Sequence, residues 1–181
     1  MTSAPASAIP KPAMTSLALD QPVRARTETV SRAQTELIDG RAITAELEKL
    51  AIAHAGNEQE LRAALAQRLK SALNDGRAKA ERLLLKDRHG RGCAERLCRM
   101  EDEIIRILFE FARNHLYQSQ NPSEAEHMAV VATGGYGRGL QAPGSDIDLL
   151  FVLPYKQTAW GESIAEAILY CLWDKIGRAH V

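Results

Sequence analysis

The stretch TGGYGRGLQAPGSDID (residues 133–148) carries most of the information in this 181-residue chain. Four glycines fall within six positions, directly after an apolar run at 128–133 that predicts a short strand. Because glycine has no Cβ, such a backbone can turn tightly and approach an anion closely. The pattern is not the dinucleotide-binding fingerprint, since Leu140 stands where the third glycine would fall, and no Gly-Lys-Ser/Thr follows to make a P-loop. The glycines alone leave a flexible turn between two strands as an equal alternative.

Two aspartates at the end of this stretch favour a chemical role. Asp146 and Asp148 begin the run at 146–153, whose continuous apolar residues suit a strand buried on both faces. In an extended strand, residues i and i+2 share a face about 6–7 Å apart, so both carboxylates can converge on a hard cation such as Mg²⁺. Acids at the start of an apolar strand are costly unless a cation or a donor satisfies them. The structural alternative is that Asp146 caps the loop and Asp148 meets an arginine.

Residues 31–120 show helical periodicity and predict a helical N-terminal region. Asn57 and Glu60 resemble a capping box, and leucines then recur every four residues from 61 to 73. Residues 74–76 (Asn-Asp-Gly) predict a weak stop, and the glycines at 90 and 92 predict the end of a second helix. A third helix keeps one apolar face over about six turns, and residues 160–174 predict a further helix. The apolar face of the third helix comprises Leu97, Met100, Ile104, Ile107, Leu108, Phe111 and His115.

Composition excludes several classes of protein. Lys plus Arg and Asp plus Glu both number 23, so the formal net charge is zero, which argues against a polybasic nucleic-acid binder and against an acidic, disordered chain. The three cysteines fit neither a zinc site nor a disulfide framework. No apolar run approaches the roughly 20 residues of a membrane span, and no secretory signal is recognisable. We therefore expect a cytoplasmic protein with no nucleic-acid or membrane partner, preceded by a flexible arm at 1–30.

The spacing of Gly134-Gly135, ten intervening residues and Asp146-Ile-Asp148 resembles the signature of the DNA polymerase β-like nucleotidyltransferase superfamily. The longer string GGYGRGLQAPGSDIDLLF is similar to one branch, the bifunctional uridylyltransferase/uridylyl-removing enzymes that modify the PII nitrogen-regulatory protein. The resemblance extends over about 126–174. It implies an α+β fold, with the helical region followed at 121–175 by the first part of a nucleotidyltransferase domain that has a mixed sheet with helices.

The resemblance also implies an activity and a set of site residues. The activity is Mg²⁺-dependent transfer of UMP from UTP to a tyrosine of PII, with release of diphosphate, in the regulation of nitrogen metabolism. An adenylyltransferase acting on glutamine synthetase and an inactive, truncated nucleotide-binding fragment are the alternatives. The superfamily's third carboxylate is not recognisable in this sequence. The site residues implied are the catalytic metal ligands Asp146 and Asp148, and the nucleotide-binding residues Gly134, Gly135, Arg138 and Ser145.

The last six residues, IGRAHV (176–181), form a separate segment. They translate one reading frame of a common sequencing adapter. We interpret them as a non-native tail on a truncated chain that lacks the uridylyl-removing half, and a natural chain end is the alternative.

Overall fold

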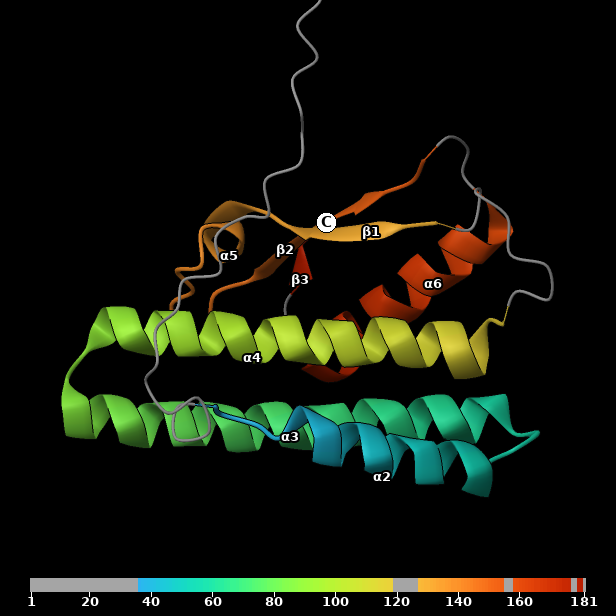
Figure 1. Ribbon diagram of the computed structural model, residues 1–181, viewed down its shortest axis with the longest axis horizontal. Helices are drawn as coiled ribbons and strands as arrows, with labels where there is room; N and C mark the ends of the chain where they lie inside the picture. The colour runs from blue at the N-terminus through green and yellow to red at the C-terminus, as the bar shows by residue number, and fades with distance from the viewer. Residues whose placement is uncertain (1–35, 119–126, 155–157, 177–178, 181) are drawn as a thin grey trace, which may run out of the picture. The chain divides into compact units, whose positions relative to one another are not determined.

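The computed structural model describes residues 36–118, 127–154, 158–176 and 179–180, all within one compact unit of the chain; the arm predicted at 1–30 lies outside them. The described part is mostly helical with a small sheet, which confirms the α+β class (Figure 1). In chain order its elements are α2 (Gly40–Ala53), α3 (Glu58–Asp87), α4 (Gly90–Phe111), the π-helical turn η1 (Ala112–Leu116), β1 (Ala129–Ala132), α5 (Gly134–Gly137), β2 (Ile147–Val152), α6 (Ala159–Tyr170), η3 (Cys171–Ile176) and β3 (Ala179–His180).

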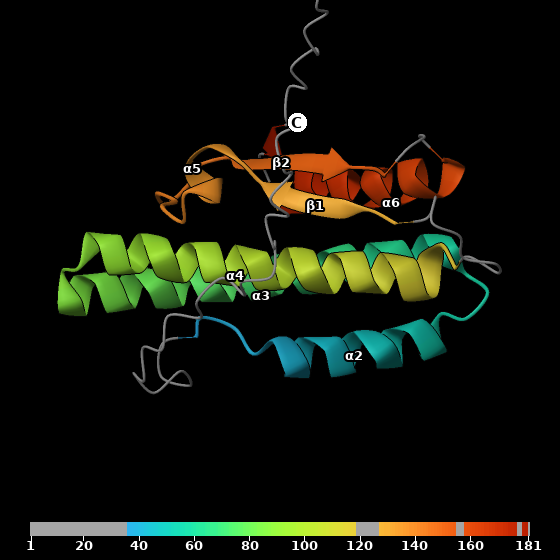
Figure 2. The same cartoon turned by 45° about the horizontal axis from the view of Figure 1, so that its top comes forward.

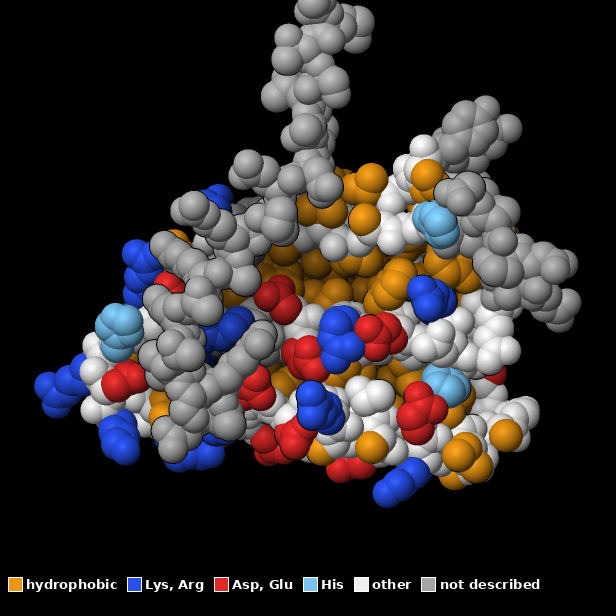
Figure 3. All heavy atoms as spheres, viewed as in Figure 1, with side chains coloured by type: hydrophobic (Ala, Val, Ile, Leu, Met, Phe, Trp, Pro, Cys, Tyr) orange, Lys and Arg blue, Asp and Glu red, His pale blue; other side chains and the backbone are white. Residues whose placement is uncertain are grey.

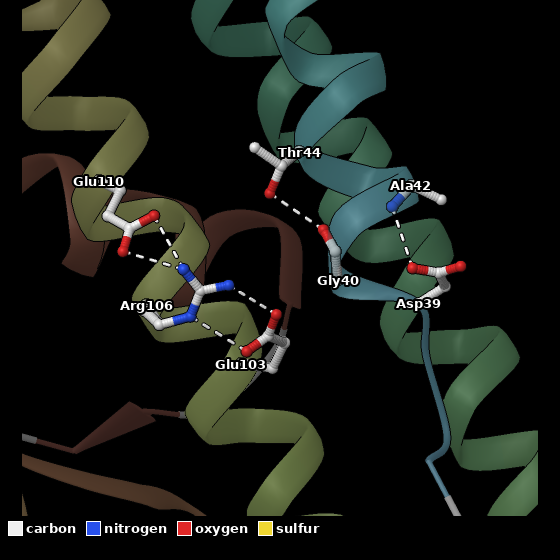
Figure 4. Close-up of polar contacts among 7 residues, drawn as sticks. All are labelled: Asp39, Gly40, Ala42, Thr44, Glu103, Arg106 and Glu110. Carbon is white, nitrogen blue, oxygen red and sulfur yellow. Dashed lines mark hydrogen bonds and ion pairs between the residues drawn. The ribbon is translucent and has the colours of Figure 1, made fainter. Parts of the chain in front are cut away.

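Polar side chains begin the long helices by accepting hydrogen bonds from otherwise unpaired backbone amides. Asp39 accepts from the amide of Ala42 at 3.0 Å and starts α2 (Figure 4). Asn57 accepts from the amide of Glu60 at 3.2 Å, which confirms the cap predicted for α3. At the start of α4, Nδ1 of His89 accepts from an amide in the same way.

Helix α4 lies at the centre of the described unit. The sheet and α6 lie above α4 in both views, α3 lies alongside α4 and also contacts η3, and α2 packs against both α3 and α4 (Figures 1 and 2). The leucine stripe of α3 is buried, and so are the apolar residues from Leu97 to Phe111 of the third predicted helix, which is α4. His115, the last residue of that predicted face, lies in η1 and is half-buried. The periodicity predicted for these two helices is therefore confirmed as their buried face.

Of the two helix boundaries predicted from glycine, one is wrong and one is confirmed. Helix α3 runs without interruption through Gly76. Glycine at this position allows α3 and α4 to pack closely, because a Cβ there would lie 2.3 Å from the sulfur of Met100. The second helix of the prediction is thus the C-terminal half of α3. The helix end predicted near Gly90–Gly92 is confirmed, since α3 ends at Asp87 with Arg88 in the left-handed region, and Gly90 then opens α4.

The sheet is built around β2. Strand β1 pairs with it antiparallel, with Ala132 opposite Leu149, and β3 pairs with it in parallel. Ile147 and Leu149 are buried towards the helices, whereas the other face of β2 is open: Leu150 is 52% exposed and Val152 is 44% exposed. The prediction of a strand buried on both faces is therefore wrong within the described unit, because helices cover only one face of this sheet.

Helix α6 confirms the helix predicted at 160–174 and continues into η3. Its start is tied to the end of the α4 segment, because the indole N–H of Trp160 donates to the carbonyl of Tyr117 at 2.9 Å. Among the described residues, no helix has the length and apolar character needed to cross a membrane. The non-native tail at 176–181 remains a prediction; its residues 177, 178 and 181 lie outside the described part.

Candidate active site

The glycine stretch and the start of β2 meet at one point. Gly134 opens α5 with a φ of +58°, a backbone conformation that glycine adopts without strain. A Cβ at this position would lie 2.1 Å from Oδ2 of Asp148, so the carboxylate lies directly against the Gly134 backbone. The amide of Thr133 donates to the carbonyl of Asp148 at 2.9 Å and fixes the two segments together. The structure thus brings Gly134 and one of the two predicted catalytic carboxylates into contact.

The burial pattern of β2 places Asp148 on the face away from the helices. Ile147 and Leu149 are buried in the core, and Asp148 alternates with them and is half-buried. Asp146 directly precedes the strand, is half-buried as a residue, and has its Oδ1 atom buried. Within the described residues Asp148 forms no ion pair, so nothing there supports the arginine-paired alternative.

The remaining predicted nucleotide-binding residues line the same loop. A Cβ at Gly135 would lie 3.9 Å from a terminal nitrogen of Arg138, so that guanidinium extends over the Gly135 backbone. The Arg138 side chain is exposed, and Ser145 is exposed just before Asp146. Their roles in binding a nucleotide remain predictions.

Sequence patterns did not indicate the two buried residues whose hydrogen bonds fix this loop in place. Tyr136, 4% exposed, donates its hydroxyl to Oδ1 of Asp102 on α4 at 2.6 Å. Gln141, 2% exposed, donates its side-chain amide to the carbonyls of Asp146 at 3.0 Å and Ser145 at 3.4 Å. An aromatic residue among glycines is a signal that could have indicated Tyr136 as an anchor. No pattern indicates Gln141.

A cleft of about 260 Å³ lies between α4 and the sheet, on the opposite face of β2 from Asp148. Figure 3 shows the apolar hollow above the charged side chains of α4. Because Leu149 and not Asp148 borders it, this cleft is separate from the candidate nucleotide site. Its lining residues are Asp102, Ile105, Arg106, Phe109, Met128, Val130, Ala132, Tyr136 and Leu149.

Among the described residues, no group of three or more His, Cys, Asp or Glu side chains could together hold a metal ion. Asp148, against the Gly134 backbone, and Asp146, two residues before it, carry carboxylate oxygens, which are donors that suit Mg²⁺. They fit the ion as two ligands of an incomplete set.

Helix α4 carries a buried carboxyl group, that of Glu101, near Tyr136 of the loop. Glu101 on α4 is 3% exposed, and its Oε2 has no hydrogen-bond partner within the described part of the chain. Burial raises the pKa of Glu101 to about 7; Arg77 on α3 opposes this shift and the neighbouring Asp102 adds to it. Glu101 is therefore a group whose protonation changes near neutral pH inside the helical core.

We expect Glu101→Gln to stabilise the chain at alkaline pH. Between pH 4.5 and 7 the folded state binds more protons at Glu101 than the unfolded state does, so its contribution to stability falls as pH rises and levels off above 7. The variant should remove this fall, a gain on the order of 3 kcal/mol at pH 8 relative to pH 4. Urea unfolding of both proteins across this range measures it, with the exposed Glu110→Gln as control. A variant-minus-wild-type difference that is independent of pH would contradict the expectation.

Comparison with known proteins agrees with this geometry. Residues 120–176 match the family model described as "Nucleotidyltransferase domain". The match includes the glycine loop, both aspartates and the strands that position them. The chain therefore carries nucleotidyltransferase-domain sequence at residues 120–176.

Over the segment that they share, the chain is similar to the bifunctional uridylyltransferase/uridylyl-removing enzymes. It is 65% identical over 144 residues to the protein of that name from Bradyrhizobium diazoefficiens and 58% identical over 150 residues to the one from Rhodopseudomonas palustris. These matches cover 78% and 81% of this chain but 16% of each relative, so the chain spans about a sixth of their length. No solved structure gives a significant match.

Proposed function

We propose that this chain carries the nucleotide-binding part of a uridylyltransferase, which transfers UMP from UTP to a tyrosine hydroxyl of the PII regulatory protein. The observation that carries the proposal is the contact between Gly134 and the Asp148 carboxylate. In this contact, a glycine backbone that phosphate oxygens can approach lies beside a carboxylate whose charge suits a metal–phosphate complex. The printed name of the relatives supports the uridylyl group, and the resemblance to enzymes that modify PII supports that acceptor.

The residues of the loop would receive the triphosphate. With no Cβ at Gly134 or Gly135, phosphate oxygens can approach the backbone amides directly. The exposed guanidinium of Arg138 lies over this backbone and can pair with a phosphate. Asp146 and Asp148 would hold Mg²⁺, which when bound neutralises charge on the triphosphate.

The transfer step places few demands on the protein beyond positioning. The phenol oxygen of the acceptor attacks the α-phosphorus of UTP, the bond to the bridging oxygen breaks, and diphosphate leaves. The free phenol has a pKa near 10, so its proton must pass to a base as the new bond forms. The loop and the carboxylates would supply orientation and charge complementarity, which account for most of the acceleration in such sites.

A label-transfer experiment tests the proposal. The transfer assays use a hybrid enzyme in which this chain replaces the aligned segment of the Bradyrhizobium diazoefficiens relative. The hybrid is incubated with Mg²⁺, PII and each α-labelled nucleoside triphosphate in turn, and glutamine synthetase serves as the alternative acceptor. We expect label from UTP on PII. Label from ATP on glutamine synthetase would support the adenylyltransferase instead, and UTP binding by the chain without any transfer would support a binding fragment.

A further inference from the structure

The glycine loop rests on a helix that precedes the matched nucleotidyltransferase segment. The hydroxyl of Tyr136 reaches Asp102 of α4 at 2.6 Å, across 34 residues of sequence. Since the family match begins at residue 120, Asp102 lies outside it. The contact therefore links the helical region to the loop that would bind the nucleotide.

A second contact joins the same face of α4 to the other end of the loop. The backbone amide of Gln141 lies close enough to the Cys98 thiol to oppose the rise in its pKa that burial causes, and Cys98 lies one helical turn before Asp102. The side chain of Gln141 in turn holds the carbonyls of Ser145 and Asp146. Tyr136 and Gln141 are thus two anchors on one helix face, one directly after the predicted phosphate-binding glycines and one just before the predicted metal ligands.

The Tyr136–Asp102 bond is suited to a lasting anchor. Burial, followed by the hydrogen bond to Asp102, raises the pKa of Tyr136 well above its usual value, so the phenol remains a donor at neutral pH. A hydrogen bond to a charged acceptor is among the stronger ones in proteins. The tyrosine ring is enclosed between the loop and α4, and a phenylalanine would keep that packing while losing only the bond.

We infer that Asp102 is a positioning residue for nucleotide binding: through the Tyr136 hydroxyl, helix α4 sets where the Gly134–Gly135 backbone lies relative to Asp146 and Asp148. This inference rests on the proposed function. It makes the helical region part of the site and explains why an aromatic residue stands among four glycines.

The test is a double-mutant cycle on the 181-residue chain, with titration of Mg²⁺-UTP. We expect Tyr136→Phe and Asp102→Ala each to raise the Kd about five- to tenfold, and the double variant to raise it no further, because both remove the same bond. Asp102→Asn should stay close to wild type, since its amide oxygen can still accept. The control is Glu110→Gln, on the same helix, whose carboxylate binds Arg106 and not the loop (Figure 4).

Hydrogen exchange separates this inference from the proposed function. The amides of Gly137 and Leu140 are bonded within the loop, to Thr133 and Gly135, and should exchange about tenfold faster in Tyr136→Phe and in Asp102→Ala than in wild type. Unchanged exchange overturns the positioning role whether or not nucleotide binds. Faster exchange with unchanged UTP affinity, or fully additive losses in the cycle, overturns it as well. Failure of the wild-type chain to bind Mg²⁺-UTP refutes the proposed function and, with it, the nucleotide role of the anchor.

Discussion

Replacing Asp148 by asparagine should lower nucleotidyl transfer about a thousandfold while leaving the fold intact. Asparagine has nearly the same shape, and the bond from the Thr133 amide to the backbone carbonyl of residue 148 is independent of the side chain. What is lost is the negative charge that would hold Mg²⁺ beside the glycine backbone. The ion would stabilise the transition-state charge, and removing one such stabilising group typically costs 10²- to 10³-fold. Asp146→Asn should behave alike, because Asp146 is the second of the two predicted metal ligands.

The measurement is UMP transfer to PII by the hybrid enzyme, with circular dichroism to confirm that the variants fold. Asp75→Asn is the matched control, because Asp75 is an exposed aspartate on α3 away from the loop. If both variants at 146 and 148 turn over at the wild-type rate, the two aspartates do not hold the catalytic metal.

Local sequence patterns predicted the elements of this fold well wherever packing follows periodicity. The leucine stripe of α3 and the apolar face of α4 could be predicted because an amphipathic helix repeats its buried positions every three to four residues. Residues 74–76 misled for a physical reason: glycine is a weak helix former, but at Gly76 close packing against Met100 outweighs that local preference.

The features of the candidate site also differ in whether local sequence patterns could predict them. The proximity of Gly134 and Asp148 could be expected, because a glycine turn and a carboxylate at short spacing make a local pattern. The contact of Asp102 with Tyr136 could not, because it spans 34 residues and no local pattern records which helix face will lie under a loop. Nor does the continuous apolar run of β2 reveal that helices cover only one face of the sheet.

The second large effect is expected at Gly134. Alanine there must adopt a φ of +58°, which costs about 1–2 kcal/mol. Its Cβ must also occupy a point 2.1 Å from Oδ2 and 3.0 Å from Cγ of Asp148. The aspartate side chain is short, so its carboxylate has to move away from the loop. A displacement of about 1 Å in a catalytic group can cost a hundredfold, so we expect Gly134→Ala to lower transfer about a hundredfold.

A matched variant separates the effect of the clash with Asp148 from the effect of the backbone strain. Gly139 has a φ of +70° in the same loop, but a Cβ there would have no atom within 4 Å. Gly139→Ala should therefore lose a similar amount of stability, about 1–2 kcal/mol by urea unfolding, while keeping most of the transfer activity. In the double variant Gly134→Ala/Asp148→Ala the unfolding midpoint should recover part of what Gly134→Ala loses, since the blocking carboxylate is gone. Equal losses of transfer in Gly134→Ala and Gly139→Ala would show that strain alone is responsible and that the approach of Asp148 to Gly134 has no part in the site.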